Sequence, residues 1–260
     1  VLPDGQEVVI KIQRPNIASV IDTDLEIMAS LAASAQTTSL GNVYDFMGIA
    51  DDFSFTLRNE LDYQREGRNA DRLRESFSGQ EQLLRIPKVH WALSTQHVLV
   101  MERINGIKIS DIPALDAAGY NRHKIALNSA SVTIKQVLED GFFHADPHAG
   151  NYLIMPGEAI GLVDFGKVGY LRDKDRMDLI RLYIVAIEMD VDGLIDQLAR
   201  IGAVREDVDR NRLAYDLNRF LNKYYGVPIK YVRARELIDE ITSITFRHRL
   251  RLPTTWWLVG

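Results

Sequence analysis

Short apolar runs bounded by turn-forming residues indicate β-strands in several parts of the chain. They lie at 8–12, 98–103, 151–155 and 161–163. Runs of this length that are rich in Val, Ile and Leu are typical of strands. The sequence Pro-Gly-Glu at 156–158 separates the last two runs and predicts a tight turn. We therefore expect these two runs to pair as a β-hairpin.

Helical periodicity follows in other parts of the chain. Apolar residues recur at helical spacing before residues 59–70 and predict one long amphipathic helix that continues through them. A mostly helical region is expected from Ser110, with a further helix from about Asp173. The apolar residues of the long helix are Phe46, Phe53, Leu57 and Leu61. The predicted fold class is α+β, with a few antiparallel strands and a long helix followed by mainly helical structure.

Composition narrows the possible functions. The chain has 260 residues, 46% of them hydrophobic, which is enough for a sizeable core. Its net charge of −5 gives no sign of a nucleic-acid partner. It contains no cysteine, which excludes disulfides and cysteine-ligated zinc, and no apolar run of about 18 residues that could span a bilayer. Because turn residues lead directly into the first strand and the last residues are apolar, we expect a piece of a longer protein.

Three polar residues carry the clearest chemical signal. Asp146 and Asn151 stand five positions apart, and Asp164 follows thirteen residues later at the end of an apolar run. An aspartate can orient an attacking hydroxyl or water, or take its proton. An amide oxygen and a second carboxylate are hard ligands suited to Mg²⁺ on nucleotide phosphates. The predicted hairpin would hold Asn151 and Asp164 on adjacent strand ends, near one metal.

Two other interpretations of the same segment remain open. Asp and His in a stretch rich in turn formers often only cap turns. Alternatively, His144, Asp146 and His148 alternate and would share one face of a strand as ligands of a transition metal. Pro147 and Gly150 favour a loop instead, and no further His or Cys cluster completes such a site.

An apolar strand with one lysine points to an ion pair. Lys11 interrupts the run at 8–12, and an unpaired buried ammonium is costly. Glu66 is the candidate partner; Asp62, four residues earlier, shares its helix face, whereas Glu60 does not. The simpler alternatives are a solvated lysine and a charged helix face with i,i+4 pairs.

Together these motifs resemble the UbiB family, the aarF-domain atypical kinases. The spacing of Asp146 and Asn151 and the Asp-Phe-Gly at 164–166 are similar to protein-kinase loops. The more specific matches are Lys-Ile-Gln-Arg-Pro at 11–15, Glu-Leu-Asp-Tyr at 60–63 with Glu66 and Asn69-Ala70, and His-x-Asp-x-His-x-Gly-Asn at 144–151. The similarity runs from Val8 to about Tyr170.

The resemblance implies a protein-kinase-like fold of two lobes that binds ATP or ADP with Mg²⁺. The lobes would be a truncated N-lobe at 1–104 and a helical C-lobe at 105–260. The implied roles are an ion pair between Lys11 and Glu66, with Lys11 on the phosphates; a catalytic Asp146; metal ligands Asn151 and Asp164; the family's E-x-D at Glu60 and Asp62; and the loop histidines His144 and His148. Met101 would back the adenine pocket, and backbone groups near Glu102 and Ile104 would bind the base.

The resemblance also implies a function in isoprenoid quinone biosynthesis, such as that of ubiquinone. We expect a protein at the cytoplasmic face of a membrane or in an organelle, peripheral or anchored by segments outside this chain. A lipid or quinone precursor and proteins of a lipid-biosynthetic complex are the expected partners. The segment after Asp-Phe-Gly is short and lacks Ala-Pro-Glu, which favours a small-molecule or lipid substrate, or ATP hydrolysis. Basic residues at 230–251 near Trp256 and Trp257 suit an anionic membrane, although a solvated helix face is the preferred interpretation.

Two alternatives from other classes stay open. A small-molecule kinase of the aminoglycoside or choline type shares the His-x-Asp loop but lacks the Glu-Leu-Asp-Tyr motif. A nucleotide-sensing scaffold without catalysis would bind ATP and not turn it over.

Overall fold

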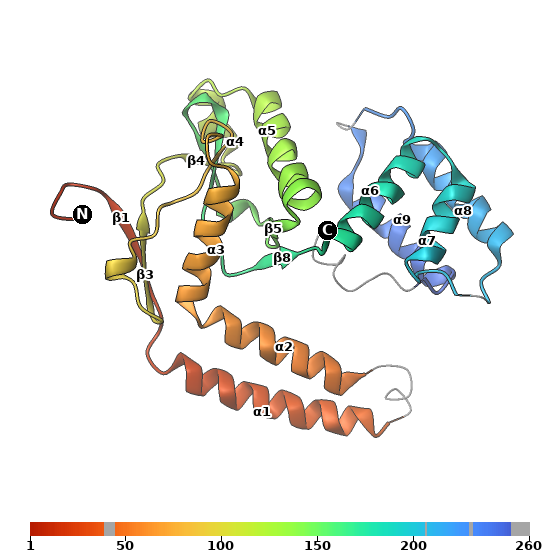
Figure 1. The fold of residues 1–260 in the computed structure, drawn as a ribbon, viewed down its shortest axis with the longest axis horizontal. Coiled ribbons are helices and arrows are strands. Elements are labelled where there is room, and N and C mark those ends of the chain that lie inside the picture. The colour runs from red at the N-terminus through yellow and green to blue at the C-terminus, as the bar shows by residue number, and fades with distance from the viewer. Residues whose placement is uncertain (39–44, 206, 229–230, 251–260) are drawn as a thin grey trace. The chain divides into compact units, whose positions relative to one another are not determined.

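The computed structural model describes residues 1–38, 45–205, 207–228 and 231–250. The fold is mixed α+β, and helices predominate, as Figure 1 shows. The chain forms two compact units, Val1–Ile134 with Phe143–Val168, and Lys135–Phe142 with Gly169–Gly260. The resemblance implies two lobes that divide at residue 104. These lobes are not the same as the two compact units, and the division at residue 104 stays a prediction.

A two-stranded antiparallel sheet opens the first unit. Strand β1 (Val8–Ile12) pairs with β3 (Val98–Glu102), so that Lys11 lies opposite Leu99. The central residues of β3 are buried, whereas much of β1 is exposed. Both predicted strands are confirmed, and β1 holds Lys11 at the edge of the sheet.

The predicted hairpin at 151–163 is also confirmed. Strand β6 (Tyr152–Met155) pairs antiparallel with β7 (Ala159–Leu162), and Gly157 in the turn between them has a φ of 81°, which glycine adopts without strain. All four residues of β7 are buried. The pair is the centre of a four-stranded sheet in the order β2-β7-β6-β4, whose outer strands are β2 (Leu84–Arg85) and β4 (Ile107–Lys108).

The single long helix expected before and through residues 59–70 is wrong. The structure has two helices, α2 (Phe46–Glu60) and α3 (Tyr63–Ser76), separated by an extended Asp62. The Asp62 carboxylate caps α3 by accepting hydrogen bonds from the backbone N–H groups of Gln64 and Arg65 at 3.0 and 3.3 Å. Apolar periodicity continued across the break, because a capping residue changes the chain direction without changing the spacing.

The remaining helices of the first unit are regular. Figure 1 shows α1 and α2 lying side by side, and many residues of the two helices are in contact. The helices are α1 (Ile17–Gln36), α4 (Ile112–Ala117) and α5 (Arg122–Ile134). Single turns of 3-10 helix occur at Trp91–Leu93, Ala149–Asn151 and Pro156–Glu158.

The second unit is a helical cluster with its own core. The helix predicted from about Asp173 is confirmed, and it is the first of four α-helices among the residues that the structure describes in this unit. They are α6 (Asp173–Ile187), α7 (Val191–Arg200), α8 (Arg210–Tyr224) and α9 (Ala234–Arg247). A π-helix covers Lys135–Asp140, and the short strands β5 (Phe142–His144) and β8 (Val168–Tyr170) form a pair where the chain passes between the units.

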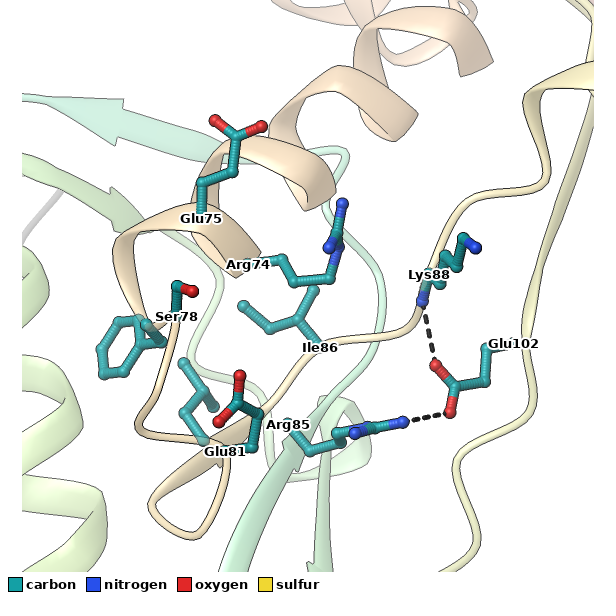
Figure 2. A pocket seen from close by; sticks show the side chains of 10 residues that line it. Arg74, Glu75, Ser78, Glu81, Arg85, Ile86, Lys88 and Glu102 are labelled. Carbon is teal, nitrogen blue, oxygen red and sulfur yellow. Dashed lines mark hydrogen bonds and ion pairs between the residues drawn. The ribbon is translucent and has the colours of Figure 1, made fainter.

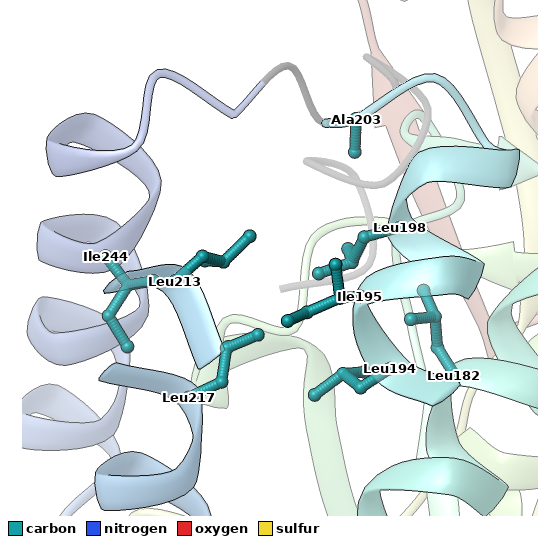
Figure 3. Close-up of a cluster of buried hydrophobic side chains, with 8 residues drawn as sticks. All are labelled: Leu182, Leu194, Ile195, Leu198, Ala203, Leu213, Leu217 and Ile244. Atoms are coloured by element: carbon teal, nitrogen blue, oxygen red, sulfur yellow. The ribbon is translucent and has the colours of Figure 1, made fainter. Parts of the chain in front are cut away.

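Aliphatic side chains fill the core of this helical cluster. On α7 the buried residues Leu194, Ile195 and Leu198 repeat at helical spacing, and they face Leu213 and Leu217 of α8 (Figure 3). The whole cluster in Figure 3 consists of Leu182, Leu194, Ile195, Leu198, Ala203, Leu213, Leu217 and Ile244. Among the described residues no helix is long and apolar enough to cross a membrane. Trp256 and Trp257 lie outside the described residues.

A buried carboxylate links α8 to the end of α9. Asp216, only 4% exposed, accepts hydrogen bonds from Arg247 Nη1 and His248 Nε2, both at 2.8 Å. The hydrogen bond from His248, helped by Arg247, outweighs burial and lowers the pKa of Asp216. A carboxyl group with a lowered pKa in the folded state stabilises the fold only while it is ionised.

We predict a pH-dependent loss of stability in Asp216→Asn. Near pH 7 the free energy of unfolding should fall by about 2 kcal/mol, because two charged hydrogen bonds weaken. The stabilisation by Asp216 is present above the ordinary pKa of 3.8 and is lost as the pH falls through the lowered pKa of the folded state. Urea unfolding should therefore show the two proteins converging in acid. Asp239→Asn, at an exposed position of α9, is the control; a gap that stays constant into acid would contradict the account.

Candidate active site

A partly buried ion pair joins β1 to α3. Lys11 Nζ lies 2.8 Å from both carboxylate oxygens of Glu66. The Glu66 side chain is 3% exposed, whereas that of Lys11 is 34% exposed. Lys11 Nζ also lies 3.5 Å from Asp164 Oδ1 and 5.2 Å from the ring centre of Tyr63. The structure thus brings together the lysine, the helix glutamate and the aspartate of Asp-Phe-Gly.

The hydrogen bonds indicate that this pair is ionised. Burial, the largest influence, lowers the pKa of Lys11, but the carboxylates of Glu66 and Asp164 outweigh it and the pKa is raised. Burial, the largest influence, also raises the pKa of Glu66 against the opposing effect of Lys11. Both oxygens of Glu66 accept hydrogen bonds from N–H donors, which favours the carboxylate.

The loop that carries Asp164 is held by side chains. Asp164 has a φ of 70°, a left-handed conformation that costs a non-glycine residue on the order of 1 kcal/mol. Glu66 Oε1 accepts from Phe165 N–H at 3.2 Å, and Asn69 Nδ2 donates to the Phe165 carbonyl at 2.9 Å. The Phe165 side chain is fully buried, and Gly166 N–H donates to Asp164 Oδ1 at 3.1 Å. These contacts fix the direction of the Asp164 carboxylate.

His144 connects this loop to Asp146. Its Nε2 lies 2.6 Å from the Asp164 carbonyl, and its Nδ1 lies 3.2 Å from the backbone nitrogen of Asp146. One nitrogen must donate and the other accept, which a neutral imidazole with its proton on Nε2 satisfies. Burial, the largest influence, lowers the pKa of His144 against the opposing effects of Asp164 and Asp146, and this favours the neutral form.

The remaining loop residues stabilise the turn that follows. Asn151 Nδ2 donates to the Asp146 carbonyl at 3.2 Å, and His148 Nδ1 accepts from Gly150 N–H at 3.0 Å. His148 therefore caps a turn, as one of the alternative interpretations expected for this stretch. Within the described ranges, no group of three or more His, Cys, Asp or Glu side chains is placed to hold a metal ion.

Asn151 and Asp164 are placed where the hairpin was expected to put them. The Val163 N–H donates to the Asn151 carbonyl at 2.9 Å, directly beyond the paired residues Tyr152 and Leu162. Because the Asn151 amide nitrogen is used by Asp146, its oxygen is the atom left to bind a ligand. An amide oxygen and a carboxylate are the hard donors that Mg²⁺ prefers, so these residues fit such an ion.

Strand β3, which is expected to contact adenine, is also held by hydrogen bonds to the segment around Lys88. Met101 and Ile104 are buried, and Glu102 N–H donates to the Lys88 carbonyl at 2.8 Å. The Glu102 carboxylate accepts from Arg85 at 2.5 Å and from Lys88 N–H at 3.2 Å (Figure 2). This ion pair borders a cavity of about 310 Å³ that shares no residue with the Lys11 and Asp164 cluster. The binding roles of Met101, Glu102 and Ile104 stay predictions.

The two acidic residues of the E-x-D motif have different contacts. Asp62 caps α3, as described above, and also lies 3.4 Å from Arg68. Glu60 Oε1 lies 3.4 Å from Lys167 Nζ, one residue after Asp-Phe-Gly. The sequence does not predict Lys167 as a partner, since a lone lysine after this motif has no distinctive pattern, and it indicates Asn69 only as part of a family motif.

A lysine on a strand, a glutamate on a helix and an Asp-Phe-Gly loop in mutual contact define a kinase-like protein. Residues 1–198 match the ABC1 atypical kinase-like domain. The chain belongs to this family, the UbiB-type atypical kinases.

Individual relatives are consistent with this assignment. The Arabidopsis thaliana protein ACTIVITY OF BC1 COMPLEX KINASE 7, chloroplastic, is 32% identical over 260 residues, covering all of this chain and 37% of the relative. An uncharacterized protein of Synechocystis is 32% identical over 261 residues, covering 99% of this chain and 44% of the relative. The chain thus spans less than half the length of these relatives.

A solved structure shares the fold. The Rv3197–erythromycin complex from Mycobacterium tuberculosis superposes with a TM-score of 0.67 at 20% sequence identity, covering 94% of this chain and 68% of that chain. At this identity the likeness concerns the fold alone.

We predict that Lys11 and Glu66 couple energetically. In a double-mutant cycle of Lys11→Met and Glu66→Gln, the free energies of unfolding should deviate from additivity by about 1–3 kcal/mol, because Lys11→Met leaves the buried Glu66 carboxylate without its cation and Glu66→Gln removes the nearest carboxylate from Lys11. The exposed pair Arg58 and Asp22, 3.2 Å apart, is the control and should couple by less than about 1 kcal/mol. Simple addition of the Lys11 and Glu66 effects would show that the contact contributes nothing.

Proposed function

We propose that this chain is the core of an atypical kinase or ATPase that uses Mg-ATP. The observation that supports this best is the contact of the partly buried Lys11–Glu66 pair with both Asp164 and the Phe165 backbone. An ordinary surface ion pair needs none of these contacts, whereas nucleotide chemistry needs a cation and a metal ligand held close together. We propose the two-lobed arrangement of kinases, with ATP or ADP between residues 1–104 and 105–260.

Each residue of the site has a proposed task. Lys11 binds the nucleotide phosphates, and Asp146 orients the nucleophile, which is water or a hydroxyl group. Asn151 and Asp164 hold Mg²⁺, which when bound neutralises charge on the phosphate oxygens. Met101 backs the adenine, and backbone groups near Glu102 and Ile104 bind its edge.

The proposed substrate is a small molecule or a lipid. Only residues 167–172 separate Asp-Phe-Gly from α6, which leaves little chain to build a groove for a peptide. We propose a role in isoprenoid quinone biosynthesis at the cytoplasmic face of a membrane or in an organelle, with a quinone precursor or a lipid as partner. The name of the Arabidopsis relative refers to the activity of the bc1 complex and to the chloroplast.

The alternatives are separated by turnover and by substrate. A nucleotide-sensing scaffold binds ATP without hydrolysing it. Radiolabelled ATP offered to the full-length protein with a peptide library, and in parallel with anionic liposomes carrying a quinone precursor, distinguishes the substrate classes. A peptide acceptor must be held in line with the phosphate, so efficient peptide phosphorylation requires a peptide-binding groove. Robust labelling of peptides without any response to the lipid would therefore overturn the proposed substrate class.

Asp164→Asn should weaken binding of Mg-ATP by about tenfold or more, because it removes the charged metal ligand. Isothermal titration calorimetry of the full-length protein measures this, with binding of metal-free ATP expected to change little. Asp116→Asn is the matched control, since Asp116 lies exposed on α4 beside Arg122. Equal Mg-ATP affinity in wild type and Asp164→Asn would remove Asp164 from the site.

A further inference from the structure

Two residues of α3 hold the backbone of Phe165 in the Asp-Phe-Gly loop at 164–166. Glu66 accepts from the N–H of Phe165, and Asn69 donates to its carbonyl. The two residues are three positions apart on the helix, so their side chains lie on one face. Both backbone groups of Phe165 are therefore bound to α3, although they are 99 and 96 residues away in the sequence.

The hydrogen bond of Asn69 to Phe165 differs from that of Glu66 because it does not involve a charged group. Glu66 Oε1 is shared between Phe165 N–H at 3.2 Å and Lys11 at 2.8 Å. A phosphate that attracts Lys11 competes with Glu66 for the ammonium and alters this shared arrangement. The Asn69 amide is neutral and has no such competitor, so its hydrogen bond persists while the charges around Lys11 rearrange.

The segment needs a fixed anchor because its backbone is strained. Asp164 has a φ of 70°, which turns the chain so that its carboxylate lies near Lys11. A left-handed aspartate persists only where its surroundings hold it. His144 holds the Asp164 carbonyl at 2.6 Å, and Asn69 holds the next carbonyl, that of Phe165. Removal of either anchor allows residue 164 to relax toward a negative φ and redirects the carboxylate.

We propose that Asn69 is a positioning residue that locks α3 to the Asp-Phe-Gly loop and so holds the Asp164 carboxylate in its metal-binding direction. This inference rests on the proposed function in taking Asp164 as a Mg²⁺ ligand. The lock itself, a helix side chain that fixes a loop carbonyl, is independent of any ligand and is measurable without one.

The test compares Asn69→Leu with Gln64→Leu in the full-length protein. Both changes replace an amide by an apolar side chain of similar size on α3, but Gln64 is exposed. In Asn69→Leu we expect about a tenfold loss of Mg-ATP affinity, with the affinity for ATP in the presence of EDTA unchanged. Hydrogen exchange of a peptide covering 163–167 should accelerate about tenfold or more without nucleotide. Gln64→Leu should change neither measurement.

The outcomes separate the lock from the proposed function. If wild type binds no Mg-nucleotide but exchange at 163–167 accelerates in Asn69→Leu, the lock stands and the proposed function fails. If Asn69→Leu does not fold, Asn69→Ala removes the same donor without adding bulk and takes its place. Unchanged exchange overturns the lock. An equal loss of affinity for ATP with and without Mg²⁺ overturns the positioning role and shows a general structural one.

Discussion

The site depends on one constraint, the burial of the Glu66 carboxylate. A buried charge without a partner is strongly destabilising, so Glu66 requires Lys11 and the Phe165 N–H. Because those groups come from β1 and from the Asp-Phe-Gly loop at 164–166, neutralising one carboxylate brings three distant segments together. Asp164 then lies 3.5 Å from the same ammonium. The main effect of the Lys11–Glu66 pair is to position these segments rather than to stabilise the fold. Ion pairs removed from water often stabilise a protein no more than apolar side chains of similar volume would.

The break between α2 and α3 makes this geometry possible. A continuous helix would carry Glu66 along the axis set by α2. Asp62 caps the start of α3, which runs in a new direction and carries Glu66 in its first turn. Gln13, close to Lys11 in sequence, donates from Nε2 to the Leu61 carbonyl at 3.0 Å and ties the break to the end of β1. Glu60, the last residue of α2, contacts Lys167, which directly follows the Asp-Phe-Gly loop. The E-x-D segment therefore belongs to the support of the site as well as to the family motif.

Local elements and the chemistry of the site could be predicted from the sequence better than the contacts that hold the site residues in place. The hairpin of β6 and β7 followed from apolar runs around a Pro-Gly turn, and the partner of Lys11 followed from the need for a countercharge. The helix break was missed because one capping aspartate leaves apolar spacing intact. Arg85, which binds Glu102, and Asn69, which binds a backbone carbonyl, were not predicted as contacts. Such contacts form between segments that are distant in the sequence. Polar residues of this kind look like ordinary surface residues, so the sequence alone contains no pattern that predicts which of them meet.

The central claim is that Asn151 and Asp164 hold a metal ion beside a nucleotide bound by Lys11. Paramagnetic line broadening by Mn²⁺, measured by NMR with a non-hydrolysable ATP analogue bound to isotope-labelled protein, tests it most directly, because broadening falls steeply with distance from the ion. The account predicts that signals of residues 151 and 163–166 broaden first, with Lys11 and Glu66 next, while those around the Arg85–Glu102 cavity stay sharp. Broadening centred on that cavity, or spread evenly over the protein, would contradict it.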